Sequence, residues 1–369
     1  MSEERKWRIA HSEFSLGWGG QEHRVIAELE GFKERGHDVW LIAPAKSQVF
    51  ARAQAMGIPT REIPTGKLAL IGSSVPLAHW LGQNQIDVLN THSSKDGWFV
   101  ALAGRMAGVP LVIRTRHIEV DYKTPWISRH AFTTLADHVL TTSDRIRDGL
   151  ARKLGLPLPH LTTLPTGIDL NRFQRKGSQH EYLQKLGKKR KLIGMISVLR
   201  SWKGHKHFIE AGIRMLEAGV KADFVITGEG PQRKNITRLI SESGYPDQFH
   251  LLGHTEDVPG VLRSLDVLAI PSYQHEGVPQ IGLQALACET PVVGSDIGGI
   301  PEIIRPGETG RIFPAQDIVA LAEQLGATLK QKKETARMVA NGRALVERQH
   351  SRGHMIDVLD GLYVRLIRE

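Results

Sequence analysis

The apolar residues of this chain follow two alternating spacings. Short continuous apolar runs predict buried strands, and segments with apolar residues three and four positions apart predict amphipathic helices. Residues 21–35 have the helical spacing, with Val25, Leu29 and Phe32 on one face, and Gly36 ends the segment. Because strands and helices alternate along the chain, we predict parallel sheets that are covered by helices on both faces.

The alternation occurs twice. The predicted strands of the first series are residues 7–10, 38–43, 88–91, 111–114 and 139–142, and those of the second are 192–196, 223–227, 250–252, 267–270 and 291–293. Helices are predicted at 21–35, 96–107, 206–218 and 356–367. We expect two Rossmann-like α/β domains, at 1–173 and 191–350, that face each other across a central cleft. Residues 174–190 would link them, and a helix within 351–369 would pack back toward the N-terminal domain.

The charge of the chain restricts its partners only weakly. The 369 residues carry a formal net charge of +9, which suits nucleic acid, anionic lipid or anionic substrates. The excess is divided almost evenly between the two halves, so we expect no nucleic-acid partner. Locally, the cations Arg105, Arg114, Arg116, Lys123 and Arg129 leave open a weak association with an anionic membrane surface.

Cysteine content and apolar run length indicate the compartment. The one cysteine, Cys288, excludes an internal disulfide and fits a reducing environment; its position predicts a small core residue on a helix. No apolar run approaches the roughly 20 residues that a transmembrane helix needs. We therefore expect a cytoplasmic protein and leave open a peripheral position at the inner face of the membrane.

Residues 271–304 are the most specific feature of the sequence. They read as a strand end, a loop with Glu276, a helix with Gln284, a second strand, a Gly298-Gly299 turn and a new helix start. Open α/β sheets bind ligands where a strand ends and a helix begins. The free N–H groups at the start of that helix, near Ile281 and Gly282, suit a phosphate.

This segment resembles the donor-sugar signature of the retaining GT-B glycosyltransferases of the GT4 family. That signature is a Glu, seven residues and a second Glu; Glu276 matches the first, and Gln284 replaces the second. The resemblance covers nearly the whole chain. It implies a GT-B fold, a nucleotide-sugar donor, retention of anomeric configuration, and no cofactor or essential metal. The sequence also contains no Asp-x-Asp pair, which argues independently against a metal-dependent route.

The resemblance also implies roles for residues elsewhere. Arg200 and Lys203, in a loop directly after a predicted strand, would hold the leaving diphosphate, and Gly19 and Gly20 would approach the donor phosphate. His117 would lie close to the reacting sugar. The remaining candidates are His92 for acceptor contacts, and Gly228 and Gly253 for the nucleoside.

Together these features predict a retaining glycosyltransferase that uses a UDP- or GDP-sugar and a glycan or lipid-linked acceptor. The Trp18-Gly19-Gly20-Gln21-Glu22 opening and Gln284 resemble members tied to lipopolysaccharide or surface-polysaccharide assembly. The donor would bind the C-terminal domain, with Glu276 on the sugar and Gln284 on the ribose, and the acceptor would bind the N-terminal domain. Two alternatives remain open: a sugar-nucleotide epimerase on the same fold, and a non-catalytic basic protein that binds anionic glycan or nucleic acid.

Overall fold

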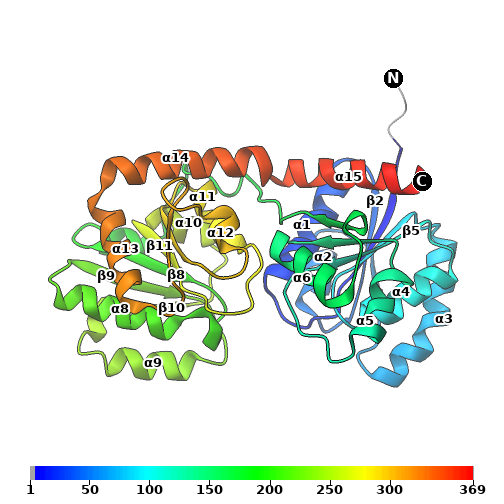
Figure 1. Ribbon diagram of the computed structural model, residues 1–369, viewed down its shortest axis with the longest axis horizontal. Coiled ribbons are helices and arrows are strands. Elements are labelled where there is room, and N and C mark those ends of the chain that lie inside the picture. Colours follow the sequence, from blue (N-terminus) through cyan, green and yellow to red (C-terminus); the bar gives the residue numbers. More distant parts are fainter. Residues whose placement is uncertain (1–4, 369) are drawn as a thin grey trace. The chain divides into compact units, whose positions relative to one another are not determined.

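The computed structural model describes residues 5–368 and divides the chain into two compact units (Figure 1). Unit 1 consists of residues 1–167 and 352–369, and unit 2 of residues 168–351. Residues 1–4 and 369 of the predicted domains lie outside the described part. Residues 174–190, for which a linker is predicted, belong to unit 2, where a short helix, α7 (Glu181–Leu186), buries Leu183 completely.

Unit 1 is built on a seven-stranded parallel sheet with the order β3-β2-β1-β4-β5-β6-β7. Its strands are β1 (Arg8–Ser12), β2 (Asp38–Ala43), β3 (Thr60–Glu62), β4 (Val88–Thr91), β5 (Leu111–Arg116), β6 (His138–Thr141) and β7 (Leu161–Thr163). Its helices are α1 (Gly20–Glu34), α2 (Gln48–Ala55), α3 (Lys67–Gln83), α4 (Asp96–Met106), α5 (Pro125–Thr133), α6 (Asp144–Leu154), the 3-10 turn Leu158–His160 and α15 (Arg352–Arg368).

The last helix of the chain completes the core of unit 1. The helix α15 packs on α1 and β5, and its apolar face, with Met355, Ile356, Leu359 and Tyr363, is buried. The approach is close: a Cβ added at Gly31 of α1 would lie 2.6 Å from Ile356 Cγ1. The final segment of the sequence therefore folds with the first, as Figure 1 shows for α15 and α1.

Unit 2 has a six-stranded parallel sheet with the order β10-β9-β8-β11-β12-β13. Its strands are β8 (Lys191–Ile196), β9 (Ala222–Thr227), β10 (Phe249–Gly253), β11 (Val267–Ile270), β12 (Val292–Ser295) and β13 (Arg311–Phe313). Besides α7, its helices are α8 (His205–Glu217), α9 (Arg233–Ser241), α10 (Val258–Ser264), α11 (Gln280–Ala287), α12 (Ile300–Ile303), α13 (Ile318–Lys330), α14 (Lys332–Gln349), and the 3-10 turns Ser201–Lys203 and Pro246–Gln248.

The fold confirms the predicted α/β class, with two parallel sheets and helices between successive strands. Every strand predicted from an apolar run is present, with ends displaced by at most two residues. The short strands β3, β7 and β13 carry too few apolar side chains to be predicted; β3 reads Thr-Arg-Glu and pairs only at the sheet edge. No helix among residues 5–368 is both long and apolar enough to cross a membrane.

Each sheet has a point where the strand order reverses. In unit 1 the first strand, β1, lies between β2 and β4, and in unit 2 the first strand, β8, lies between β9 and β11. The connections from these strands leave in opposite directions, and open α/β sheets bind ligands beyond the carboxyl ends of the strands at such a point. A functional site is therefore expected among the residues that follow β1, β4, β8 and β11.

Candidate functional site

An ion pair lies at the point of strand reversal in unit 2. Lys203 follows β8 and Glu276 follows β11, and the Lys203 ammonium contacts Glu276 Oε1. The hydroxyl of Ser272 donates to the same oxygen at 2.6 Å. Only 7% of the Glu276 side chain is exposed. Because both contacts use Oε1, Oε2 has no hydrogen bond within the described part of the chain and can accept one from a ligand.

Close backbone contacts fix the position of Glu276. Gly298 has a φ of +61°, and a Cβ there would lie only 2.1 Å from the carbonyl oxygen of Glu276. A Cβ on Gly299 would lie 2.7 Å from the nitrogen of Val278. From β12, the hydroxyl of Ser295 donates to the carbonyl of Ser272 at 2.5 Å. The Gly298-Gly299 turn predicted from sequence therefore packs closely against the backbone of the Glu276 loop.

The loop that carries Lys203 is joined to the end of β11 in the same way. Gly204 has a φ of +82°, and a Cβ there would lie 2.0 Å from the carbonyl oxygen of Pro271. The Tyr273 N–H donates to the carbonyl of Trp202 at 2.8 Å. Arg200 begins this loop and is exposed, with its guanidinium 5.0 Å from the centroid of the Trp202 ring. Arg200 is thus close in sequence to Lys203, but within the described residues it makes no ion pair.

The helix α11 carries three predicted donor-binding residues. The N–H of Gly282 already donates to Pro279 at 3.0 Å, and a Cβ at Gly282 would lie 2.8 Å from Ile303 Cδ1. Gly282 therefore serves close packing of the helix as well as any ligand, and Ile281 is the better phosphate donor of the two. Gln284 is half-buried, and its side-chain amide makes no hydrogen bond among residues 5–368.

The two glycines predicted for the nucleoside lie at the same edge of the sheet. Gly228 follows β9 and Gly253 ends β10, and the Gly228 N–H donates to Gly253 at 2.7 Å. Both have positive φ, +139° and +78°. A Cβ at Gly228 would lie 1.9 Å from the carbonyl oxygen of Ser197 after β8. Thus the structure brings Gly228 and Gly253 together with the loop that leads to Arg200 and Lys203.

In unit 1 the Gly19-Gly20 loop ends at the start of α1. Gly19 is the residue before the helix, and its N–H donates to the Glu22 side chain at 2.8 Å. This contact, the Glu22 half of a capping box, occupies the N–H of Gly19, in the loop that the resemblance places near the donor phosphate. Gly20 is the first helical residue. Both lie beyond the carboxyl end of β1, at the point of strand reversal.

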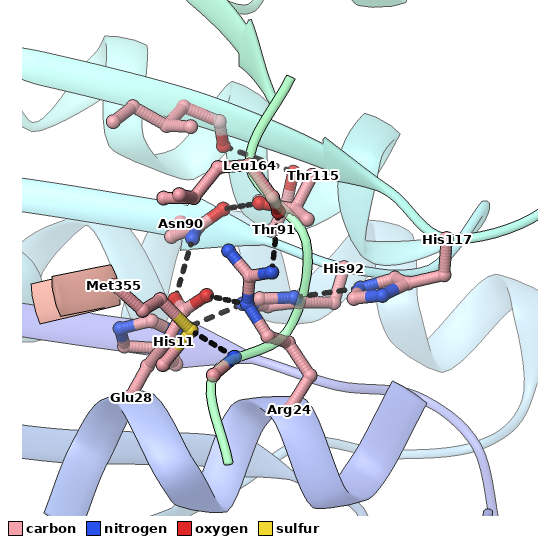
Figure 2. A network of polar contacts seen from close by, with 12 residues as sticks. His11, Arg24, Glu28, Asn90, Thr91, His92, Thr115, His117, Leu164 and Met355 are labelled. Atoms are coloured by element: carbon pink, nitrogen blue, oxygen red, sulfur yellow. Dashed lines mark hydrogen bonds and ion pairs between the residues drawn. The ribbon is translucent and has the colours of Figure 1, made fainter. Parts of the chain in front are cut away.

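A buried polar network lies beside this point (Figure 2). His11 is on β1, His92 follows β4 and His117 follows β5. His11 Nδ1 lies 2.8 Å from His92 Nε2, and His92 Nδ1 lies 3.0 Å from His117 Nε2. From α1, Glu28 pairs with Arg24, and its Oε2 lies 3.5 Å from His11 Nδ1.

All three rings of this network are held neutral. Burial lowers the pKa of His11 to about 4. Burial, helped by the Arg24 cation, lowers the pKa of His92 and that of His117 well below the ordinary value. Nearby, burial and the Asp96 carboxylate raise the pKa of Glu13 to about 8, so this carboxyl is largely protonated at neutral pH.

The ligand atoms of His11, Glu28 and His92 lie within 4.8 Å of one another, which makes them a candidate metal centre. Two observations argue against that use. Glu28 already pairs with a buried guanidinium, and the His11–His92 separation of 2.8 Å is a hydrogen-bond distance. Two nitrogens bound to one tetrahedral Zn²⁺ at about 2.1 Å would lie roughly 3.4 Å apart.

The basic residues predicted to meet anionic lipid are mostly unsuited to it. Arg114 and Arg116 are buried, and Arg114 donates to the carbonyl of Gly97 at 2.9 Å. Arg105 forms an ion pair with Asp137 at 2.7 Å. The prediction was wrong for Arg114 and Arg116 because β5 continues through Arg116 and both side chains are buried in the unit.

Sequence reasoning did not find several residues that shape these two places. Ser272 donates to Glu276, and Ser295 donates to the carbonyl of Ser272. His11, Arg24 and Glu28 belong to the buried polar network that contains His117. A signal existed for His11 and for Asn90, since a polar residue within an otherwise apolar strand has to find a partner. Arg24 and Glu28, by contrast, look like an ordinary exposed i,i+4 pair on a helix.

Comparison with known proteins relates both halves of the chain to sugar transfer. A family model described as Glycosyltransferase Family 4 matches residues 18–172, and one described as Glycosyl transferases group 1 matches residues 178–345. The chain is 25% identical to the UDP-Gal:alpha-D-GlcNAc-diphosphoundecaprenol alpha-1,3-galactosyltransferase of Escherichia coli over 98% of each chain. It is 27% identical to a lipopolysaccharide core biosynthesis mannosyltransferase of Rhizobium meliloti over 63% of this chain and 66% of the relative.

Solved structures share the fold. A glycosyltransferase from Rickettsia africae superposes with a TM-score of 0.88 over 99% of each chain, at 17% identity. Alr3699/HepE from Anabaena, solved with UDP, superposes with a TM-score of 0.84 over 97% of this chain and 100% of that one, at 18% identity. At this identity the likeness establishes the architecture.

Proposed function

Since the chain belongs to family 4 of the glycosyltransferases and is itself a glycosyltransferase, we propose that it moves a hexose or related sugar from a UDP- or GDP-sugar to a glycan or lipid-linked acceptor. The acceptors that the relatives' names contain, a diphosphoundecaprenol-linked sugar and a lipopolysaccharide core, support the choice of acceptor class. Family membership favours this function over an epimerase and over a non-catalytic binding protein. We place the reaction in lipopolysaccharide or surface-polysaccharide assembly.

The Glu276–Lys203 pair at the strand reversal of unit 2 carries this proposal. The free Oε2 of Glu276 can accept hydrogen bonds from sugar hydroxyls, and the fixed backbone around it holds that oxygen in place. Lys203 supplies a positive charge beside it for the diphosphate, and Arg200 can swing from Trp202 to add a second. Ile281, at the start of α11, offers an N–H to the same phosphates.

The remaining predicted residues take the roles that the family resemblance implies. Gln284 binds the ribose, and Gly228 and Gly253 line the nucleoside. In unit 1, His117 contacts the reacting sugar, and Gly19 and Gly20 approach the donor phosphate. In the reaction, the bond between the anomeric carbon and the phosphate oxygen breaks with its electron pair on the diphosphate. The acceptor oxygen bonds the anomeric carbon on the same face, and its proton passes to the departing phosphate.

Donor binding followed by turnover tests this function. Thermal unfolding of the protein is measured with UDP, GDP and their sugars, because a ligand of the folded state raises Tm. The stabilising nucleotide is then supplied as its sugar with and without excess EDTA. We expect one nucleotide class to raise Tm, and its sugar to release nucleoside diphosphate equally with and without EDTA. No binding of either class would contradict the function, and loss of turnover that Mg²⁺ restores would contradict its independence from metal.

A lipid-linked acceptor would bring the protein to the cytoplasmic face of a membrane. The support for this comes from apolar side chains rather than from the cations of β5. Ile71 and Val75 on α3 and Leu102 and Met106 on the adjoining α4 are exposed, and Trp126 on α5 is 70% exposed. Co-sedimentation of wild type and Trp126→Ser with anionic and neutral vesicles tests the association. We expect weaker sedimentation of the variant; equal partition of both proteins to all vesicles would contradict it.

A further inference from the structure

The three histidines of unit 1 form a directed row whose proton positions can be worked out from their surroundings. His11, His92 and His117 come from the ends of three adjacent strands, β1, β4 and β5, and their rings follow one another side by side (Figure 2). Each link in the row joins two ring nitrogens. Since each neutral imidazole carries one proton, the first proton position determines all the others.

Glu28 determines the position of the first proton. Its carboxylate lies 3.5 Å from His11 Nδ1 and can only accept, so it attracts a proton on that nitrogen and repels a lone pair there. The other nitrogen, His11 Nε2, is buried and has no hydrogen-bond partner. A proton on Nε2 would be an orphaned N–H, which is rarer and costlier in a core than an unused acceptor. Both observations place the proton on Nδ1.

The proton positions of His92 and His117 follow from that of His11. His11 Nδ1–H donates to His92 Nε2 at 2.8 Å, so His92 carries its own proton on Nδ1. His92 Nδ1–H donates to His117 Nε2 at 3.0 Å, so His117 must also carry its proton on Nδ1. Burial and the Arg24 cation keep every ring singly protonated, because they lower the pKa of all three. The nitrogen of His117 that lies outside the row is then a hydrogen-bond donor.

We propose that Glu28, acting through His11 and His92, holds His117 in the tautomer that carries its proton on Nδ1. Glu28, His11 and His92 are positioning residues, and His117 alone offers its N–H to a substrate. Asn90 holds Glu28 in position at the start of the row. The side-chain amide of Asn90 donates to Glu28 at 3.3 Å, and the hydroxyl of Thr115 donates to the side-chain oxygen of Asn90 at 2.8 Å. The tautomer stands independently of catalysis; only its consequence for turnover rests on the proposed role of His117.

The tautomer can be measured in the intact protein. Histidine rings are labelled with ¹⁵N, and the His117 signals are assigned by their loss in His117→Gln. In wild type at neutral pH we expect the chemical shift of a protonated nitrogen for Nδ1 and of an unprotonated one for Nε2. The opposite pair of shifts, or two averaged shifts, would overturn the proposal. So would a stoichiometric metal ion in the purified protein, since the metal would replace the His11–His92 bond.

Two matched variants test whether the row sets the tautomer of His117. His11→Phe keeps a buried ring and the Arg24–Glu28 pair but breaks the link to His92. His138→Phe is the control, because His138 is as deeply buried in the same sheet, on β6, and bonds Thr162 outside the row. In His11→Phe we expect averaged His117 shifts and a kcat about tenfold below that of the control, with the donor KM unchanged. His117 shifts that stay as in wild type would overturn the relay. Averaged shifts with a kcat equal to the control would uphold the relay and count against the catalytic role of His117.

Discussion

The two units place polar residues at the same point of their sheets but in different ways. In unit 2 the charged residues lie in loops after the strands, and Glu276 keeps one carboxylate oxygen without a protein partner. In unit 1, His11 and Asn90 lie on strands and Glu28 lies on α1, and all three are buried; Asn90 donates to Glu28, whose Oε2 lies 3.5 Å from His11 Nδ1. Unit 2 thus offers charges to a ligand directly, whereas unit 1 uses most of its polar groups to orient one residue.

The two units hold their polar groups in position by different means. A buried polar group without a partner costs about 1–3 kcal/mol, so the core of unit 1 pairs most of its polar groups with one another. The loops of unit 2 are held instead by glycines that let backbone approach backbone, at Gly204 and Gly298. Substitutions should therefore act directly on ligand contacts in unit 2, and in unit 1 on stability or on proton positions, with their consequence for kcat.

The largest effect is expected from Glu276→Ala. The change removes the carboxylate that we assign to the sugar hydroxyls, and we expect kcat to fall by at least about a hundredfold, because hydrogen bonds to charged groups are strong and positioning is lost with them. The nucleotide should still bind. Steady-state kinetics and calorimetric titration of the nucleotide measure both. A kcat near that of wild type would remove Glu276 from the reaction.

A pair of glycine variants separates backbone strain from displacement of the site. Gly298 and Gly307 both have positive φ, +61° and +70°, so alanine strains both, by about 1 kcal/mol each. Only at Gly298 would the new Cβ meet backbone, the carbonyl oxygen of Glu276; at Gly307 it meets nothing within 4 Å. We expect a loss of Tm in both variants, larger in Gly298→Ala because the clash adds to the strain, and a loss of activity, about tenfold or more, in Gly298→Ala alone. Equal activities in the two variants would show that the Gly298 contact does not position Glu276.

Falling pH should weaken unit 1 through its buried histidines, while Glu13 and Asp96 act in the opposite direction, because burial raises the pKa of both carboxyls. Burial lowers the pKa of His11 and that of His138 to about 4, and it also lowers the pKa of His92 and His117; in unit 2 burial lowers the pKa of His205 to about 4 and also lowers that of His207 and His250. The unfolded chain takes up these protons near pH 6.5, so the stabilisation is complete above that pH and is lost as pH falls toward 4. Each such histidine contributes a slope of up to about 1.4 kcal/mol per pH unit.

Hydrogen exchange followed by mass spectrometry reports this loss for each unit. Between pH 7 and pH 5, after correction for intrinsic exchange rates, peptides from β1, β4 and β5 should lose less protection in His11→Phe than in wild type, because the substitution removes one of the titrating groups. Peptides from β8 and β11 should behave alike in the two proteins. Equal losses from β1, β4 and β5 in wild type and His11→Phe would contradict the contribution of His11.

The smallest effect is expected from Gln284→Glu. A carboxylate can accept from both ribose hydroxyls and bonds them more strongly than an amide oxygen does, so we expect donor binding to be unchanged or a few-fold tighter. Gln284→Ala should bind the nucleotide more weakly than either. Calorimetric titration compares the three proteins. If all three bind with the same affinity, Gln284 does not contact the ribose.

Several parts of this protein could be predicted from its sequence because they depend on local patterns. The apolar runs of β1, β4, β8 and β11 identify buried parallel strands, and their alternation with helices predicts an α/β layer architecture. Motif spacing placed Glu276 and Lys203 after strands, where the structure has them. Short edge strands such as β3 were missed because backbone pairing to β2, rather than side-chain pattern, makes them strands.

Only the tertiary structure decided which polar residues meet. Residues 11, 92 and 117 are far apart in sequence, and they become one hydrogen-bonded row because the sheet order places β1, β4 and β5 side by side. The helix α1 brings Glu28 to within 3.5 Å of His11. The same folding buries Arg114 and Arg116, which the sequence shows merely as two cations. A residue type states what a side chain can donate or accept, but its partner, its exposure and therefore its proton depend on which strands the fold brings together.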